Sequence, residues 1–523
     1  MVLIARGSQR SNCSRLLVES VCIAVLYSVG YVLSSTYHLY AFLWMLAGCI
    51  AVFAYYSIRA RNLLDLRAIL CASITGSIAV CQLRMADFQM VWGLKTWICH
   101  GLTLICFCLG YGLVKIYANS LVGKFTNIKN KIYTKGKIKF GLNPKKVYYA
   151  AIFLAIMPVV LFCIQVYIKG FIPIFEQRYD AYTRFYTRLS IFINLVMFSA
   201  PLAYWCLKNM KLSRWQKVLM WAIIPLPSII FQLMVQRGLF IWSICIFLVM
   251  TFFESDHKFL AVVLCGALLV FGVFFSSAMR GLTSIDMSKI WQIHGEIVLD
   301  NPSSTTTPTV ATTTSPPATE PPVTSPPATE PPVTTPNTDP TTPTTKPSDP
   351  PSDSGQKTTI VLPGFLYAPY YYVTNGMENF NNMVMNLDEH AWGLRQLTPF
   401  TVVLRFPALR ERIANLPEYE LLENGSAGSI CGDFYYDFGF IGVFIEMLLV
   451  GVVCAVVSVF TKRHDLFATL EYGVLFAVTL TAFFTPWFTQ FGTWLFAGTA
   501  FLIFLFVYFS RTKKREKEVN EPA

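Results

Sequence analysis

The sequence predicts an all-α membrane protein: a polytopic bundle of about twelve spanning helices with one large extracytoplasmic loop. Composition is the first observation, because 54% of the residues are hydrophobic, only 14% are charged and the mean hydropathy is +0.49. These values exclude an ordinary soluble globular protein. The second observation is a polar stretch of about 160 residues between Ala278 and Gly439, with apolar segments of bilayer-spanning length on both sides.

The apolar segments divide the chain into three parts. A first membrane bundle of about nine spans occupies 1–280, the loop occupies 281–437, and a second bundle of about three spans with a basic tail occupies 438–523. The first segment lacks a small-residue cleavage site and is interpreted as a retained signal-anchor. The candidate spans are 16–35, 38–57, 64–82, 96–117, 147–168, 189–207, 218–236, 239–254, 259–279, 439–460, 466–488 and 492–510.

The distribution of Lys and Arg predicts the orientation. With a cytoplasmic N-terminus, alternate crossings place 27 of the 42 basic residues on the cytoplasmic side. The positive-inside rule therefore predicts that both termini are cytoplasmic and that the long loop is outside. The net charge of +12 needs no nucleic-acid partner, because most of it faces anionic lipid headgroups in this topology.

The long loop has a low-complexity centre and more structured flanks. Residues 301–356 are rich in Pro and Thr, and the ten residues at 315–324 recur identically at 325–334. This insert cannot bury apolar area, so we expect it to be disordered and largely polyproline II. The apolar residues of 283–299 and 379–396 recur near helical spacing and predict amphipathic helices, which lie on the membrane face or pack over the bundle. Residues 363–374 form an aromatic-rich connection between them.

Arginines on the outer side are the candidate substrate-binding residues. Guanidinium is the preferred side chain for bidentate phosphate binding, so they could bind a phosphate or pyrophosphate there. Arg184 and Arg188 are expected on one helical face at i and i+4, while Arg237 and Arg280 are expected at outer helix ends, each followed by Gly. The alternative interpretation is that these side chains snorkel to lipid headgroups. The full set is Arg178, Arg184, Arg188, Arg237, Arg280 and Arg405.

Four residues are candidates for acid–base catalysis. His294 and Glu296 lie on the first predicted amphipathic segment, and His390 lies on the second. Glu446 lies inside an apolar span, where a carboxylate is costly and is expected either to act in catalysis or to pair with an arginine of another helix. A histidine in a loop is commonly only solvated. No cysteine pattern typical of a metal site is present, and Cys431 is the one cysteine in the loop, so we expect neither a metal, nor a cofactor, nor a disulfide framework there.

Several motifs together resemble a known family. They are the run Gly-Phe-Ile-Pro-Ile-Phe at 170–175, the Arg-Gly pairs at 237–238 and 280–281, the segment 372–380 and the segment Gly-Asp-Phe-Tyr-Tyr-Asp-Phe-Gly-Phe-Ile-Gly at 432–442. Outside 301–356, the chain resembles bacterial oligosaccharide repeat unit polymerases of the O-antigen polymerase (Wzy) class. The Pro/Thr-rich insert departs from the family pattern but falls where a large outer loop is expected.

The resemblance implies a function in polysaccharide biosynthesis, for lipopolysaccharide or capsule. Such polymerases are multi-pass proteins of the bacterial inner (cytoplasmic) membrane. They transfer a growing glycan from undecaprenyl diphosphate to a new lipid-linked oligosaccharide unit on the outer face. The implied partners are this lipid-linked oligosaccharide, membrane lipid and a chain-length regulator protein. No Walker A motif is present, so the donor must already be activated.

Three alternatives stay open from the sequence. An O-antigen ligase would share the architecture and the donor but use a different acceptor. A polysaccharide flippase or transporter would carry charges at the membrane midplane and internal repeats, whereas the charges here gather toward one face. A structural or sensory membrane protein would merely display the Pro/Thr-rich insert.

The predicted topology can be tested with reporter fusions. A reporter placed after Ser354 is expected outside and one placed after Lys135 is expected in the cytoplasm, because of the distribution of basic residues. Paired alkaline phosphatase and green fluorescent protein fusions measure the side of each site. Reporters that locate both sites to the same side would overturn the topology.

Overall fold

The computed structural model is a helical assembly with one short pair of strands. It describes residues 2–86, 88–135, 138–140, 142–176, 181–284, 364–401, 406–417, 428–461 and 465–511. The insert at 301–356 therefore lies outside the described residues. So does the predicted helix at 283–299, except for residues 283 and 284 at the end of the preceding helix. The chain divides into a unit formed by Met1–Gly295 and Val361–Ala523, to which all the described residues belong, and a second unit, Glu296–Ile360.

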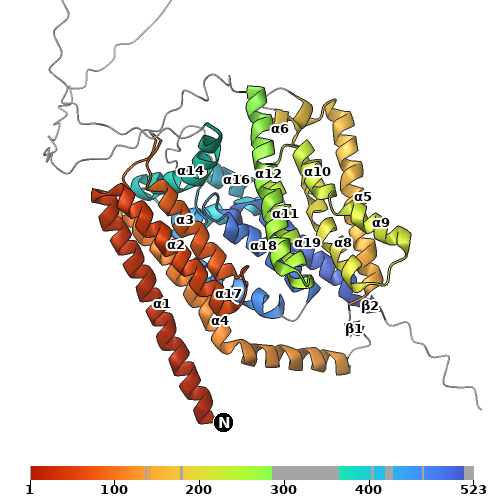
Figure 1. Ribbon diagram of the computed structural model, residues 1–523, viewed down its shortest axis with the longest axis horizontal. Helices are drawn as coiled ribbons and strands as arrows, with labels where there is room; N and C mark the ends of the chain where they lie inside the picture. Colours follow the sequence, from red (N-terminus) through yellow and green to blue (C-terminus); the bar gives the residue numbers. More distant parts are fainter. Residues whose placement is uncertain are drawn as a thin grey trace, which may run out of the picture. The chain divides into compact units, whose positions relative to one another are not determined.

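The first half of the chain forms long helices joined by short turns (Figure 1). Asp65 caps one helix by accepting a hydrogen bond from the backbone N–H of Arg67, and Gly170 ends another in the left-handed conformation at φ 77°. These elements are α1 (Val2–Thr36), α2 (His38–Ala60), α3 (Leu66–Cys81), α4 (Leu94–Lys135), β1 (Ile138–Phe140), α5 (Pro144–Lys169), η1 (Pro173–Phe175), α6 (Ala181–Phe185), α7 (Arg188–Ile193), η2 (Asn194–Phe198), α8 (Ser199–Asn209), α9 (Arg214–Ile223), α10 (Leu226–Leu233), α11 (Arg237–Glu254) and α12 (Lys258–Ser284).

The second half adds a group of shorter helices and three more apolar ones. The elements are α14 (Gly364–Asn386), α15 (Leu394–Thr401), α16 (Pro407–Ala414), α17 (Gly432–Thr461), α18 (Leu466–Leu480), η3 (Trp487–Thr489), α19 (Phe491–Tyr508) and β2 (Phe509–Arg511). Strands β1 and β2 pair antiparallel, with Ile138 opposite Arg511. This strand pair is a small departure from the predicted all-α fold.

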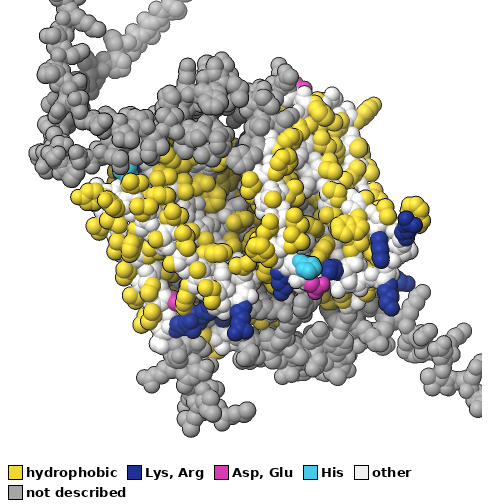
Figure 2. Space-filling view, in the orientation of Figure 1, with side chains coloured by type: hydrophobic (Ala, Val, Ile, Leu, Met, Phe, Trp, Pro, Cys, Tyr) yellow, Lys and Arg dark blue, Asp and Glu magenta, His cyan; other side chains and the backbone are white. Residues whose placement is uncertain are grey.

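Among the described residues, nine helices are long and apolar enough to cross a membrane, and three further apolar helices are shorter. One of the three is α18, whose 15 residues rise only about 22 Å and fall short of the roughly 30 Å hydrocarbon core. Figure 2 shows a broad hydrophobic surface, with Lys and Arg gathered along the lower edge of the view. The chain is thus a multi-pass membrane protein by its helices, and the full count of twelve crossings stays a prediction.

Three predicted segments differ in detail. The segment 218–236 is interrupted, because Pro225 and Pro227 end α9 and begin α10. The segment 189–207 is built from α7, η2 and α8. The aromatic stretch 363–374 is not a connection, since α14 begins at Gly364 and ends at Asn386, before the predicted helix 379–396 is complete.

Helices α4 and α17 pack closely at two glycines. A Cβ atom at Gly110 would overlap the carbonyl oxygen of Leu448, and one at Gly451 would overlap the carbonyl oxygen of Phe107. The two backbones therefore touch where side chains would normally separate them, as at other small-residue helix crossings in membranes. Around this crossing α4 also packs on α1, and α17 also packs on α18.

Helix α14 is buried although it is polar. Six of its polar side chains are at most 7% exposed: Thr374, Asn375, Glu378, Asn379, Asn381 and Asn382. The indole N–H of Trp92 donates to Glu378 at 2.9 Å, and Thr96 donates to Asn381 at 2.7 Å. The helix contacts α3, α4 and α17, which agrees with the second of the two predicted placements, packing over the bundle. The hydrogen bonds from Trp92 and Thr96 compensate in part for burying its polar side chains, while Glu378 Oε1 and Asn382 Oδ1 have no hydrogen-bond partner among the described residues.

The α4–α17 crossing predicts that alanine substitution lowers stability at one glycine and not at another. Gly451→Ala should lower the free energy of unfolding by about 1–3 kcal/mol, because the new methyl group displaces a backbone. Gly498→Ala is the matched control, since a Cβ at Gly498 meets no described atom within 4 Å and alanine favours the helix. Thermal unfolding of the purified protein in detergent measures both variants. Equal stability of the two variants would contradict the close crossing.

Glu378 predicts a pH dependence of stability. Burial raises the pKa of Glu378 to about 7, so the folded protein holds this proton more tightly than the unfolded chain does. The contribution of Glu378 to stability is therefore highest below about pH 4.5 and falls by about 3 kcal/mol as the pH rises to about 7. Glu378→Gln should remove this part of the pH dependence, because the amide still accepts from Trp92.

Unfolding measured across pH 4.5–7.5 tests this dependence. The exposed Glu389 supplies the control, Glu389→Gln, which should keep the wild-type pH profile. Identical profiles for wild type and Glu378→Gln would contradict the assignment.

Candidate functional site

Half of the residues predicted for the site can be placed fully. Arg178, His294, Glu296 and Arg405 lie outside the described residues. Arg280 is a helical residue of α12, four positions before the helix ends, and only its backbone is described. The remaining predicted residues are Arg184, Arg188, Arg237, His390 and Glu446.

Arg184 and Arg188 do not share a helix. Arg184 lies in the short helix α6, and Arg188 is the first residue of α7. The side chain of Thr187 caps α7, so the chain starts a new helix between the two arginines and the expected i, i+4 pair is wrong. Both side chains are exposed, and the Arg184 guanidinium lies 5.8 Å from the ring of Phe171.

Arg237 lies beside the segment that follows the insert. It is the first residue of α11, after a turn in which the β-branched Val235 adopts φ 56°. A positive φ is strained for such a residue, and strained turns persist where the surroundings fix them. The Arg237 guanidinium lies 5.0 Å from the ring centre of Tyr372 in α14. One candidate arginine is thus brought to the same part of the protein as α14.

His390 lies in the turn between α14 and α15. Its ring meets that of Tyr435 edge-on, with 5.7 Å between the centroids. Its Nδ1 is buried and has no hydrogen-bond partner among the described residues. A Cβ atom at Gly439 would lie 2.8 Å from His390 Nε2. Gly439 has φ 61° at a kink in α17, so glycine is needed there both for the backbone and for the histidine.

The start of α15 is fixed to α17 by a carboxylate. Asp437 accepts hydrogen bonds from the backbone N–H groups of Arg395 and Gln396, each at 3.0 Å. The carbonyl oxygen of Asp437 also accepts from the Trp392 backbone at 2.9 Å. A negative charge at a helix N-terminus is stabilising. This contact sets the position of the whole 390–396 segment on the kinked end of α17.

Two more carboxylates of α17 face the same segment. Asp433 accepts a hydrogen bond from Arg395 Nε at 3.2 Å, and Glu446 accepts one from the Gln396 side chain. Among the described residues, the side-chain hydrogen bond to Glu446 comes from an amide and not from an arginine. The guanidinium of Arg395 lies 5.7 Å from the ring of Tyr436, and its side chain is 41% exposed.

Three of these residues were not predicted as site residues: Asp433, Asp437 and Gln396. A signal for two of them is present in the sequence, because Asp433 and Asp437 are four residues apart at the start of an apolar helix and would share a helical face. Carboxylates so close to a membrane span are costly without partners. Gln396 carries no comparable signal, since its role follows from the fold of the 387–393 turn.

A groove of about 680 Å³ opens next to His390. Trp392 stands at this groove with 77% of its surface exposed, and its φ of 53° is strained for a bulky residue. Aromatic faces with a few convergent polar groups are typical of ligand sites. The groove is lined by Glu389, His390, Ala391, Trp392, Leu394, Ala408, Glu411, Arg412, Asn415, Leu416 and Pro417.

The described side chains contain no group of three or more His, Cys, Asp or Glu residues placed to hold a metal ion. The polar side chains of the groove and its exposed tryptophan ring suit an organic ligand that presents hydroxyl groups. A sugar has this chemistry, with hydroxyls for polar side chains and an apolar face for a tryptophan ring.

The comparisons with known proteins add no relative. No protein-family model matches the chain, and neither a curated protein nor a solved structure matches it.

Proposed function

We propose that the chain is a membrane glycosyltransferase that polymerises oligosaccharide units carried on a polyprenyl diphosphate, at the extracytoplasmic face of the bacterial cytoplasmic membrane. One observation carries the proposal most: the groove at His390 and Trp392 adjoins the polar cluster on α17. Arg237 contacts α14, which leads into the same segment. The proposed site thus uses the groove as the surface for a glycan and assigns Arg237, which contacts Tyr372 in α14, as a cation for a phosphate group.

The groove suits the acceptor glycan. Its volume of about 680 Å³ has the size typical of small-molecule sites, roughly 300–1,000 Å³. Trp392 offers an exposed ring for the apolar face of a sugar, while Glu411 and Asn415 offer hydrogen-bonding groups for its hydroxyls. The strained backbone at Trp392 is fixed by its hydrogen bond to Asp437, and its ring lies edge-on to that of Phe438, with 6.3 Å between the centroids.

The reaction needs a base and a stabilised leaving group. The acceptor hydroxyl attacks the anomeric carbon of the donor, and its proton passes to the His390 imidazole. The bond between that carbon and the diphosphate oxygen breaks, and its electron pair leaves with the diphosphate. Guanidinium groups stabilise the charge that develops there, a role we assign to Arg237 and Arg280. The donor is already activated, so the mechanism uses neither ATP nor a cofactor.

The His390 assignment predicts loss of polymer. His390→Ala should abolish long glycans while the protein level stays normal, because the acceptor hydroxyl loses its base and general-base catalysis contributes about 10²–10⁴-fold. Mass spectrometry of lipid-linked glycans measures the accumulated intermediate. His257→Ala is the matched control, since His257 is exposed and immediately precedes α12.

The same experiment separates the alternative functions. A polymerase defect accumulates single units on the outer face, a ligase defect accumulates finished polymer on the carrier lipid, and a flippase defect traps single units inside. Unchanged glycans in His390→Ala would remove His390 from the mechanism. Either of the other two patterns would replace the proposed function.

If Arg237 and Arg280 bind the diphosphate, a positive charge alone at these positions is insufficient for the full rate of polymerisation. Arg237→Lys and Arg280→Lys keep the positive charge but lose the forked geometry, so each should slow polymerisation by up to about 100-fold. Arg214→Lys is the control, because Arg214 is an exposed arginine at the start of α9. The distribution of glycan chain lengths on a gel is the readout. Wild-type ladders from both lysine variants would exclude these two arginines from the donor site.

A further inference from the structure

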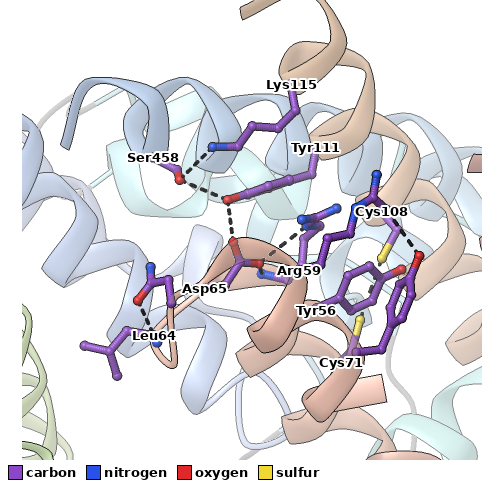
Figure 3. Close-up of polar contacts among 12 residues, drawn as sticks. Tyr56, Arg59, Leu64, Asp65, Cys71, Cys108, Tyr111, Lys115 and Ser458 are labelled. Carbon is purple, nitrogen blue, oxygen red and sulfur yellow. Dashed lines mark hydrogen bonds and ion pairs between the residues drawn. The ribbon is translucent and has the colours of Figure 1, made fainter. Parts of the chain in front are cut away.

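A second polar site lies at the far end of α17. Asp437 and Ser458 are 21 residues apart on this helix, which corresponds to about 30 Å along the axis, close to the thickness of the hydrocarbon core. Around Ser458, side chains from α2, α3 and α4 converge (Figure 3). A pocket of about 220 Å³ opens here, lined by Leu16, Arg59, Ala60, Asp65, Arg67, Gly112, Lys115 and Ile116.

Arg67 is the central cation of this pocket. It is 6% exposed, and its guanidinium lies between two tyrosine rings, 4.7 Å from Tyr56 and 4.6 Å from Tyr111. Its Nε contacts Asp65 at 3.4 Å. The two terminal guanidinium nitrogens donate no hydrogen bond to any described residue, although Arg67 lines the pocket. Among the described residues, no nitrogen of Arg67 is a buried side-chain atom that lacks a partner, so the terminal nitrogens reach the open pocket, where a ligand can accept their hydrogen bonds.

Asp65 contacts only the backbone N–H and the Nε of Arg67, and not the terminal guanidinium nitrogens. One of its oxygens accepts from the backbone N–H of Arg67 at 3.1 Å. The other accepts from the hydroxyl of Tyr111 at 3.2 Å. This tyrosine also contacts Ser458 at 3.0 Å, as the dashed lines in Figure 3 show. The carboxylate therefore fixes the framework of the pocket and leaves the outward donors of Arg67 directed to a ligand.

Two more cations stand at the pocket. Lys115 donates to Ser458 at 3.1 Å and lies 5.3 Å from the ring centre of Tyr111. Arg59 is paired with Glu19. Arg15 also lies 3.8 Å from Glu19. Among these described side chains the cations are Arg15, Arg59, Arg67 and Lys115 and the carboxylates are Asp65 and Glu19, which gives a net charge of +2. An anion would complete the balance.

We propose that this pocket binds a phosphoryl group, carried either by the headgroup of an anionic membrane lipid or by a small soluble phosphate. The fork of Arg67 suits two phosphoryl oxygens, and Lys115 adds a point charge. The volume of about 220 Å³ equals that of about seven waters in the liquid and is ample for a phosphoryl group. The apolar wall of Leu16, Gly112 and Ile116 is suited to the glycerol end of a lipid headgroup. The site is independent of the proposed glycosyltransferase reaction.

A purely structural ion-pair network is the competing explanation. It would account for the Arg59–Glu19 and Arg67–Asp65 pairs. It would not require a cavity at the outward donors of Arg67, nor a surplus of cations around it. The two explanations differ in one measurable respect, since only the phosphoryl site binds an added ligand.

Binding to the full-length purified protein in detergent tests the proposal. Three probes are titrated and followed by native mass spectrometry and thermal unfolding: inorganic phosphate, dihexanoyl phosphatidylglycerol, and dihexanoylglycerol, which lacks the phosphate. We expect at least one phosphate-bearing probe to bind and to raise the unfolding temperature, and the phosphate-free lipid to have no effect. Binding of the phospholipid alone identifies a headgroup site, whereas binding of inorganic phosphate identifies a site open to soluble phosphates.

Two variants of pocket residues test whether the probes bind in this pocket. Lys115→Gln changes the rim without disturbing the Asp65–Arg67 pair, and the double variant Asp65→Asn with Arg67→Gln removes that pair without leaving a lone buried charge. Each should weaken binding by about tenfold or more, the usual effect of losing a charge-assisted hydrogen bond. Arg214→Gln, at an exposed site, should bind as wild type does. Absence of binding by both phosphate probes, equal binding of dihexanoylglycerol, or wild-type affinity in both pocket variants would overturn the proposal.

Discussion

The backbone contact between α4 and α17 at Gly110 and Gly451 is the constraint on which both polar sites depend. Lipid gives two helices no hydrophobic reason to associate, so close packing must supply the attraction. Two glycines permit this because each removes the side chain that would meet a backbone carbonyl oxygen. Helix α17 is thereby held along its length, with the Asp433–Asp437 end at the groove and Ser458 at the other site.

The kink at Gly439 determines which way the first turns of α17 present their side chains. A straight helix would continue its own hydrogen-bond ladder, whereas here the preceding turn points Asp437 toward the N-terminus of α15. His390 occupies the space that a side chain at position 439 would fill. The residues of the groove are therefore positioned by backbone geometry and by a carboxylate. Such preorganisation is what a binding site needs in order to fix a ligand's orientation.

The sequence predicted the spanning helices well because the bilayer imposes a single requirement on them, internal backbone hydrogen bonding over an apolar length. It failed where partners from distant segments decide the outcome. The predicted helix 379–396 could lie either on the membrane face or over the bundle, and the contacts of α14 with Trp92 and Thr96 could not be foreseen. Arg67 lies inside the predicted span 64–82, but the two tyrosine rings and the Asp65 carboxylate that surround it there could not be foreseen. Arg184 and Arg188 looked paired by spacing, yet a local cap at Thr187 separates their helices.

The buried polar helix α14 also constrains how the protein is made. A segment with six polar side chains directed into the structure cannot partition into lipid alone, so it waits at the membrane surface until its protein partners exist. Two of those partners, α3 and α4, are synthesised earlier, but α17 follows it in the chain. Helix α17 must therefore be in place before α14 can be fully enclosed. A chain that stops short of α17 leaves the polar side chains of α14 without one of their three helical partners, so the last part of the sequence completes the burial of a helix made before it.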